Sequence, residues 1–128
     1  MKGRILHHAS MATEQWRQGV LTRMLVSAVS GAAELCIFEQ FCDPGCGAPI
    51  HTHTVEEVLA VLQGTAEITL GEARHVLNAG QSAVIPAGLR HGFVNTGEGV
   101  LHVQATLAAP VFEAVDEGGV MRRRWVAA

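Results

Sequence analysis

Tyrosine is absent from this 128-residue sequence, and aromatic residues of all kinds make up only 5% of it. Hydrophobic residues nevertheless account for 48% of the chain. Because few large rings are available, the core has to be built mainly from Val, Leu, Ile and Ala. This composition suits a packed barrel with a modest cavity, and the length is sufficient for one domain with its own core.

Long hydrophobic runs are also missing. No apolar stretch approaches the ~20 residues that a membrane span requires. The N-terminus lacks the apolar segment of a secretory signal. We therefore expect a soluble, cytoplasmic protein without a membrane partner.

The sequence has no excess of positive charge. Its formal net charge is −3 and its pI is about 6.1. Composition therefore gives no reason to expect a nucleic acid or an anionic membrane as a partner. The only basic run, residues 122–124, is interpreted as a solvated tail. Contact with a phosphate or a protein partner is the alternative interpretation of this run.

Cysteine is scarce, and Cys36, Cys42 and Cys46 form an odd set without CxxC spacing. Neither a disulfide framework nor a thiolate metal site is indicated. We interpret all three as small core or loop residues. For Cys46, which shortly precedes the histidine pair described below, a redox or ligand role is the alternative.

Turn-forming residues recur about every 6–12 residues, and no long segment has helical periodicity, a pattern typical of an all-β sandwich or barrel. We expect one domain over residues 1–128 with short terminal arms. Residues 11–18 are interpreted as a short helix or an arm anchored by Trp16. The tail from Ala108 is interpreted as a segment that covers a sheet edge, either of its own subunit or of a neighbouring one. The expected strands are Val20–Ser27, Glu34–Cys42, Glu57–Leu62, Thr65–Leu70, Ala73–Leu77, Ser82–Ile85, His91–Thr96 and Val100–Leu107.

His51 and His53 are the most informative residues of the chain. Two histidines one residue apart on a strand point to the same face, roughly 6–7 Å apart at the backbone, so both rings can reach one cation. Glu57 has the same parity and shares that side if the chain stays extended, although a bend at residues 54–55 would break the phase. His91 adds a third imidazole. Three imidazoles and one carboxylate are typical donors for a divalent transition metal.

These four residues lie within two longer patterns. Residues 45–64 read G-x(5)-H-x-H-x(3)-E-x(6)-G, and residues 80–95 read G-x(5)-P-x-G-x(2)-H-x(3)-N. Both patterns resemble the paired motifs of the cupin family at every fixed position and in the family's order, which is a specific signal. The resemblance implies a small jelly-roll barrel, also called a double-stranded β-helix. It also implies that His51, His53, Glu57 and His91 hold a metal in the lumen.

The other fixed positions of the two motifs have structural interpretations. The glycines supply backbone angles that tight turns need: Gly64, Gly80 and Gly88. Pro86 stiffens the turn that presents His91, and Asn95 is expected to hold a neighbouring loop by hydrogen bonds. On the last expected strand of the barrel, a polar face of His102, Gln104 and Thr106 points either into the lumen or, as we favour, to solvent.

A metal held by three nitrogens and one oxygen on one side usually keeps one or two positions open for water or substrate. Iron, manganese, nickel, cobalt, copper and zinc all accept these donors, so the sequence does not choose among them. Glu56 competes with Glu57 as the carboxylate ligand. The spacing to Gly64 favours Glu57, and strand alternation turns Glu56 to solvent. Glu57 is also the candidate catalytic residue, as a proton acceptor.

The resemblance implies a metal-binding protein that acts on, or binds, a small organic molecule. Because the ligand set resembles that of quercetinase-type members, we favour dioxygenase-like oxidation. The alternatives are a cupin isomerase, decarboxylase or lyase, a non-catalytic sensor or binding protein, and a protein whose metal is purely structural. The strand edges of a small barrel and its apolar arms further favour a homodimer.

Overall fold

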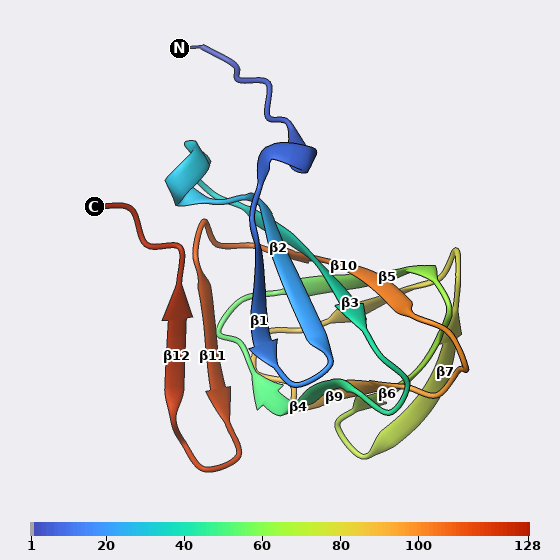
Figure 1. Ribbon diagram of the computed structural model, residues 1–128. Coiled ribbons are helices and arrows are strands. Elements are labelled where there is room, and N and C mark those ends of the chain that lie inside the picture. Colours follow the sequence, from blue (N-terminus) through green and yellow to red (C-terminus); the bar gives the residue numbers. More distant parts are fainter. Residues whose placement is uncertain (1) are drawn as a thin grey trace.

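The computed structural model describes residues 2–128, which are almost entirely β-sheet (Figure 1). These residues include two short 3-10 helices, η1 (His8–Ser10) and η2 (Ala28–Ser30), and none of their helices has the length and hydropathy of a membrane span. The strands are β1 (Thr13–Arg17), β2 (Val20–Val26), β3 (Cys36–Cys42), β4 (Gly47–Thr52), β5 (Glu57–Gln63), β6 (Thr65–Leu70), β7 (Ala73–Asn78), β8 (Ser82–Ile85), β9 (His91–Asn95), β10 (Leu101–Leu107), β11 (Phe112–Asp116) and β12 (Met121–Arg124).

The strands form two antiparallel six-stranded sheets that enclose the core (Figure 1). Sheet A has the strand order β1-β2-β3-β10-β5-β8, and sheet B has the order β12-β11-β4-β9-β6-β7. The chain passes repeatedly from one sheet to the other, which is the arrangement of a jelly roll. The predicted all-β jelly-roll barrel is therefore confirmed.

Strand β10 shows how the space between the sheets is filled. Its apolar residues are buried: Leu101, Val103, Ala105 and Leu107. The alternate, polar residues are half-buried on the opposite face: His102, Gln104 and Thr106. Successive residues of a strand point to opposite faces, so the apolar set builds the core and the polar set lies outside it. The interpretation that this polar face points away from the lumen is confirmed.

The N-terminal segment differs from its prediction. Residues 13–17 form strand β1, which pairs with β2 across a turn at Gly19, so the short-helix interpretation is wrong. Pairing with β2 satisfies the backbone hydrogen bonds of this segment, and such long-range pairing overrides weak local propensity. Trp16 does anchor the segment: its ring centroid lies 4.8 Å from that of Phe112 and 5.6 Å from that of Phe38.

The C-terminal tail forms a hairpin, β11 and β12, whose strands the sequence did not indicate. Strand β11 pairs with β4 and places Asp116 opposite His51. The tail thus covers an edge of its own sheet, one of the two options expected for it. The ring centroids of Trp125 and Trp16 lie 5.6 Å apart, so the segment directly after β12 packs against β1.

Glycines act in two ways around the site. Gly64, Gly80 and Gly88 have φ values of 92°, 87° and 82°, which confirms their predicted role in turns. Gly92 permits a close approach instead. A side chain there would begin 2.7 Å from the carbonyl oxygen of Ala48, so only glycine lets β9 and β4 come this close immediately after His91.

Asn95 stabilises the loops at the other end of β9. Its side chain is 2% exposed and makes three hydrogen bonds. Its Nδ2 donates to the carbonyl oxygens of Cys42 and Gly99, and its Oδ1 accepts from the backbone N–H of Gly97. The predicted loop-holding role of Asn95 is confirmed.

A charged network lies across β2, β3 and β10 on the outer face of sheet A. Glu39 is 8% exposed, and its carboxylate oxygens lie 2.8 Å from Nε of Arg23 and 2.7 Å from Nε2 of His102. Burial raises the pKa of Glu39, but the hydrogen bonds from His102 and Arg23 outweigh burial and lower its net pKa. Glu39 is therefore ionised and paired in the folded protein near neutral pH.

Replacing Glu39 by Gln should lower the free energy of unfolding by about 1–3 kcal/mol near neutral pH, because two charge-assisted hydrogen bonds are lost. A carboxyl group whose pKa is lowered by folding contributes stability above its unfolded pKa, and this contribution is lost as the pH falls through the folded value. The difference between wild type and E39Q should therefore shrink below about pH 4. Urea unfolding followed by tryptophan fluorescence measures it, with the exposed E98Q as a near-neutral control. A difference independent of pH would contradict the assignment.

Candidate metal centre

The three predicted histidine ligands come from adjacent strands of sheet B. His51 lies near the end of β4, His53 directly follows that strand, and His91 begins β9 in register with His51. The register of β4 and β9 shifts between Ala48 and His51, an irregularity that re-aims side chains near a site.

Glu57 reaches the same place from the other sheet. The chain bends at residues 54–55, between His53 and the first residue of β5, and so crosses from sheet B to sheet A. Glu57 therefore does not reach the histidines as a residue on the same face of one extended strand. The structure brings Glu57 into the group that its spacing predicted, but the crossing between sheets positions it. Glu56, its competitor, is exposed.

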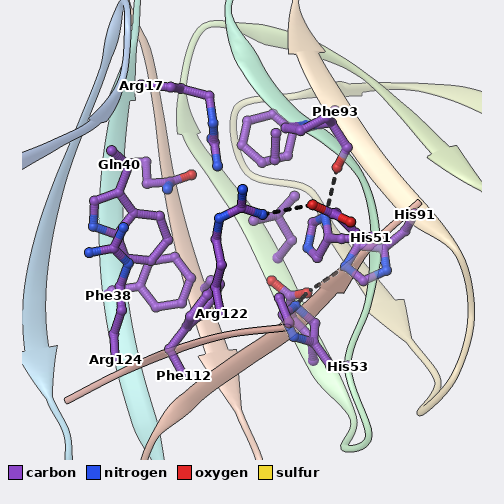
Figure 2. Close-up of a pocket in the computed structure, with 18 residues that line it drawn as sticks. Arg17, Phe38, Gln40, His51, His53, His91, Phe93, Phe112, Arg122 and Arg124 are labelled. Carbon is purple, nitrogen blue, oxygen red and sulfur yellow. Dashed lines mark hydrogen bonds and ion pairs between the residues drawn. The ribbon is translucent and has the colours of Figure 1, made fainter. Parts of the chain in front are cut away.

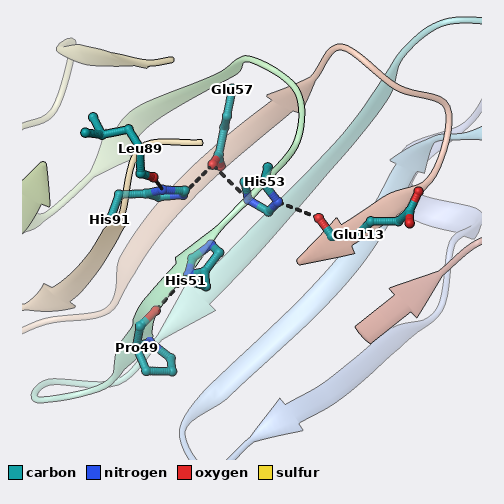
Figure 3. A network of polar contacts seen from close by, with 7 residues as sticks. All are labelled: Pro49, His51, His53, Glu57, Leu89, His91 and Glu113. Carbon is teal, nitrogen blue, oxygen red and sulfur yellow. Dashed lines mark hydrogen bonds and ion pairs between the residues drawn. The ribbon is translucent and has the colours of Figure 1, made fainter. Parts of the chain in front are cut away.

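His51, His53, Glu57 and His91 converge as shown in Figure 3, and we call them the His3Glu group. One donor atom from each residue lies within 4.8 Å of the others. Donors about 2 Å from a common ion are at most roughly 4 Å apart, so small side-chain adjustments would bring all four onto one ion. The group could therefore hold a metal ion.

Backbone carbonyls orient all three imidazole rings (Figure 3). The Nδ1 atoms of His51, His53 and His91 lie 2.7, 2.6 and 2.8 Å from the carbonyl oxygens of residues 49, 113 and 89, respectively. A carbonyl only accepts hydrogen bonds, so each Nδ1 carries a proton and donates it. The Nε2 atoms are then the nitrogens that face an ion, which is the usual outer-shell arrangement of metal-binding histidines. In this structure Nε2 of His91 donates to Oε1 of Glu57 at 2.9 Å, so metal binding at His91 would release this proton.

One of these nitrogens is buried without a hydrogen bond. His53 is 4% exposed, and its Nε2 has no hydrogen-bond partner among the described residues. Oε1 of Glu57 lies 3.2 Å from it, but not in hydrogen-bonding geometry. A buried polar atom without a partner destabilises a fold by about 1–3 kcal/mol. A bound cation would satisfy this nitrogen, so the donor set fits a divalent transition metal.

Two of the four side chains favour the protonation states that metal binding needs. Burial raises the pKa of Glu57, but the contacts of its carboxylate with the His53 and His91 rings outweigh burial and lower the pKa to about 2. Burial, aided by neighbouring His91, lowers the pKa of His51 to about 4. Near neutral pH, Glu57 is therefore a carboxylate and His51 a neutral imidazole, as ligands must be.

The His3Glu group opens into a cavity of about 310 Å³ between the sheets (Figure 2). Apolar side chains form much of its wall: Trp16, Phe38, Ala48, Pro49, Leu59, Phe93, Ala105, Phe112 and Ala114. Its polar lining, besides the His3Glu group, consists of Arg17, Gln40, Asp116, Arg122 and Arg124. A largely apolar cavity with a few convergent polar groups is typical of a small-molecule site.

These arginines are the part of the site that the sequence did not indicate. Residues 122–124 were interpreted as a solvated tail, but they lie on β12, and Arg122 and Arg124 line the cavity. Arg123 takes the other face of β12 and does not line the cavity. On a strand, Arg122 and Arg124 share one face and Arg123 takes the other. The sequence would reveal this only if the tail were already known to be a strand. Cys46 is not in contact with the cavity, and all three cysteines are free.

Comparison with known proteins agrees with this geometry. A family model described as "Cupin domain" matches residues 38–107, more than half of the chain and all of the His3Glu group. Protein SchB of Streptomyces halstedii is 30% identical over 98 residues, which cover 76% of this chain and 71% of SchB. Auxin-binding protein 1 of Arabidopsis thaliana is 31% identical over 93 residues, 66% of this chain but only 47% of that protein.

Solved structures show the same fold at low identity. KdgF from Halomonas sp. aligns with a TM-score of 0.72 at 18% identity, over 84% of this chain and 94% of KdgF. The polyketide cyclase RemF of Streptomyces resistomycificus gives 0.73 at 21%, over 99% and 88%. Oxalate decarboxylase of Lactobacillus farciminis gives 0.78 at 18%, over 87% of this chain and 35% of the enzyme. At these identities the likeness concerns the fold alone.

Replacing Glu57 by Gln should weaken Co²⁺ binding at least about 100-fold, because changes to residues that merely support metal ligands already cost 10–100-fold. The substitution removes the group's one negative charge and nearly preserves its shape. Titration of the metal-free protein with Co²⁺, followed by visible absorption, measures the affinity. The matched control H75Q, at an exposed histidine of β7, should bind as wild type does. Equal affinities for E57Q and wild type would exclude Glu57 as a ligand.

Proposed function

This chain belongs to the cupin domain family, and from that premise we propose that it is a metal-dependent enzyme acting on a small organic molecule. The His3Glu group would hold one divalent transition metal. Iron, manganese, nickel, cobalt, copper and zinc all suit three imidazoles and a carboxylate.

The observation that carries this proposal is the cavity beside the His3Glu group. A structural metal site is closed by protein ligands, whereas a catalytic one keeps a position open. The four donors here come from β4, β5, β9 and the segment after β4, and the cavity of about 310 Å³ lies against them. A volume of this size suits a small molecule. This space favours catalysis over a purely structural ion.

A bound divalent ion would supply Lewis acidity and a position for an oxygen atom of the substrate. The protein's own residues would do the rest. Carbonyl-anchored rings hold the histidines rigidly, so little reorganisation accompanies binding. Phe38 and Phe112 exclude water from one wall of the cavity.

Glu57 would also serve as a proton acceptor. In the absence of metal, His53 and His91 hold its pKa at about 2, where a carboxylate is a weak base. A divalent ion bound to Glu57 would also keep the basicity of this carboxylate low. Glu57 would therefore accept a proton from an enolisable substrate through a carboxylate oxygen that does not bind the ion.

We propose dioxygenase-like oxidation as the reaction. Protein loaded with iron, manganese or nickel should consume oxygen in the presence of an enolisable substrate, and E57Q should lose at least about 100-fold of that rate. An oxygen electrode with a panel of flavonols and 1,3-dicarbonyl compounds measures it, with H75Q as the control. Loss of substrate without oxygen uptake would instead identify a lyase, decarboxylase or isomerase. Binding without turnover would identify a sensor.

We also propose that the protein is a homodimer. On the outer face of sheet A, Val84 lies opposite Val58, and the row continues through Thr106 to Ile37. Val84 is 61% exposed, and the exposed Leu62 lies on the same face of β5. Exposed aliphatic rows of this kind favour association with a second copy.

Light scattering should give a solution mass of twice the 13.6 kDa chain. The V84E variant should shift this mass towards that of one chain, because a charge in an apolar interface must be desolvated. The control V76E places the same charge on an exposed valine of β7, in the other sheet, and should leave the mass unchanged. A wild-type mass of 13.6 kDa would refute the dimer.

A further inference from the structure

The cavity carries a charge opposite to that of the whole protein. The chain has a formal net charge of −3. Three arginines line the cavity, against two carboxylates, Glu57 and Asp116, so the lining carries 3 − 2 = +1 with neutral histidines. A divalent ion in the His3Glu group would raise this to +3. A small cavity whose net charge has one sign concentrates ligands whose charge has the other sign.

Two of the arginines already have partners. Arg122 donates from Nη1 to Oδ2 of Asp116 at 2.9 Å. Arg124 lies over the ring of Trp16, 4.2 Å from its centroid, and donates to Glu14 at 3.3 Å. These contacts hold both guanidinium groups at the cavity, and the carboxylates offset part of their charge.

Arg17 has no such counter-charge. Its Nη1 donates to the carbonyl oxygen of Gly47 at 2.8 Å, and it forms no ion pair with a carboxylate of residues 2–128. Partial burial lowers its pKa, and the positive charges of Arg122 and Arg124 lower it further. The guanidinium is thus held at the cavity beside like charges, with donors left unused.

Figure 2 shows how the charged groups lie. Arg17 and Arg122 come from opposite sides of the cavity and point toward each other, with His51, His53 and His91 beyond Arg122. Two guanidinium groups that face each other repel unless an anion lies between them. Their planar forks are well suited to bind a carboxylate or another oxyanion.

The rest of the cavity indicates what the anion is attached to. Phe38 and Phe112 are buried in its wall, with ring centroids 5.6 Å apart. Gln40 is 3% exposed and donates through Nε2 to Thr22 Oγ1 at 3.0 Å. Its Oε1 makes no hydrogen bond to the described residues, which leaves an acceptor for a hydroxyl or amine of a ligand. The cavity thus combines an apolar wall with charged and polar groups.

We propose that this cavity binds a small organic anion whose acidic group lies between Arg17 and Arg122, whose apolar body packs against Phe38 and Phe112, and whose far end reaches the His3Glu group. This inference rests on the proposed function, since it names the substrate class of the same cavity. Arg17 is the specificity-determining residue, because it is the guanidinium without a protein counter-charge.

A matched pair of probes tests this inference. The carboxylate 2-naphthoate and its neutral analogue 2-naphthamide have nearly the same size and ring system. Calorimetric titration of metal-free and Zn²⁺-loaded protein should show naphthoate binding about tenfold or more tightly than naphthamide in both forms. Persistence of the preference in the metal-free form separates the arginine site from direct ligation of an ion.

Variants then locate the preference. R17Q should abolish most of the preference for naphthoate over naphthamide. R17K should retain part of it, because lysine keeps the positive charge but lacks the paired N–H donors of a guanidinium group. R122Q should also weaken naphthoate binding, since it leaves Asp116 unpaired beside the ligand. The control R123Q removes the same charge from the same strand, but from a side chain that pairs with Glu113 outside the cavity, and should bind both probes as wild type does.

Several outcomes would overturn the inference: no binding of 2-naphthoate, equal affinities for the two probes, discrimination that R17Q and R122Q leave intact, or an equal loss in R123Q. Failure of the proposed function is a separate result. In that case the naphthoate preference and its dependence on Arg17 would persist, while the metal-loaded protein would turn over none of the substrates offered.

Discussion

The site depends on three hydrogen bonds from histidine Nδ1 atoms to backbone carbonyls, at 2.6 to 2.8 Å. They determine which nitrogen of each ring carries the proton, so they determine that the Nε2 atoms face one point. Two of the carbonyls belong to residues just ahead of the histidine itself, Pro49 for His51 and Leu89 for His91. The third, from Glu113, is sixty residues away in sequence. Ring orientation at this centre is therefore partly local and partly a product of the whole fold.

The long-range bond explains why the C-terminal hairpin matters to a site whose ligands all lie between residues 51 and 91. Strand β11 supplies the carbonyl for His53, and its Phe112 ring lies 5.6 Å from that of His53. The same hairpin is tied to the N-terminal strand through the Trp16–Trp125 contact. Strand β1 and the C-terminal hairpin thus lie together on one side of the barrel, and the hairpin supports the His3Glu group. Changes to outer-shell partners of this kind typically lower metal affinity by about 10–100-fold.

The sequence was sufficient to predict the barrel and the four members of the His3Glu group, because the signals for both are local. Turn glycines, strand alternation and the H-x-H spacing depend on neighbours along the chain, and Thr65–Leu70 and Ser82–Ile85 have the predicted bounds. What the sequence could not provide depends on pairing across the fold. Residues 13–17 are a strand only because β2 lies beside them, and Arg122 and Arg124 line the cavity only because the C-terminal hairpin pairs with β4 through β11. Glu57 joins the predicted group because the chain crosses between the sheets, not because of strand parity.

The C-terminal hairpin contributes to the cavity in two ways. The carbonyl oxygen of Glu113 orients His53 in the His3Glu group, and Asp116 and Arg122 form a charged part of the cavity wall. Asp116 lies opposite His51 in the register of β11 and β4, so its position is coupled to the strand that carries two of the histidines. An anion that bound Arg122 would compete with Asp116 for that guanidinium and act directly on β11. Binding of a ligand by Arg122 and ring orientation at the His3Glu group therefore both depend on the hairpin of β11 and β12.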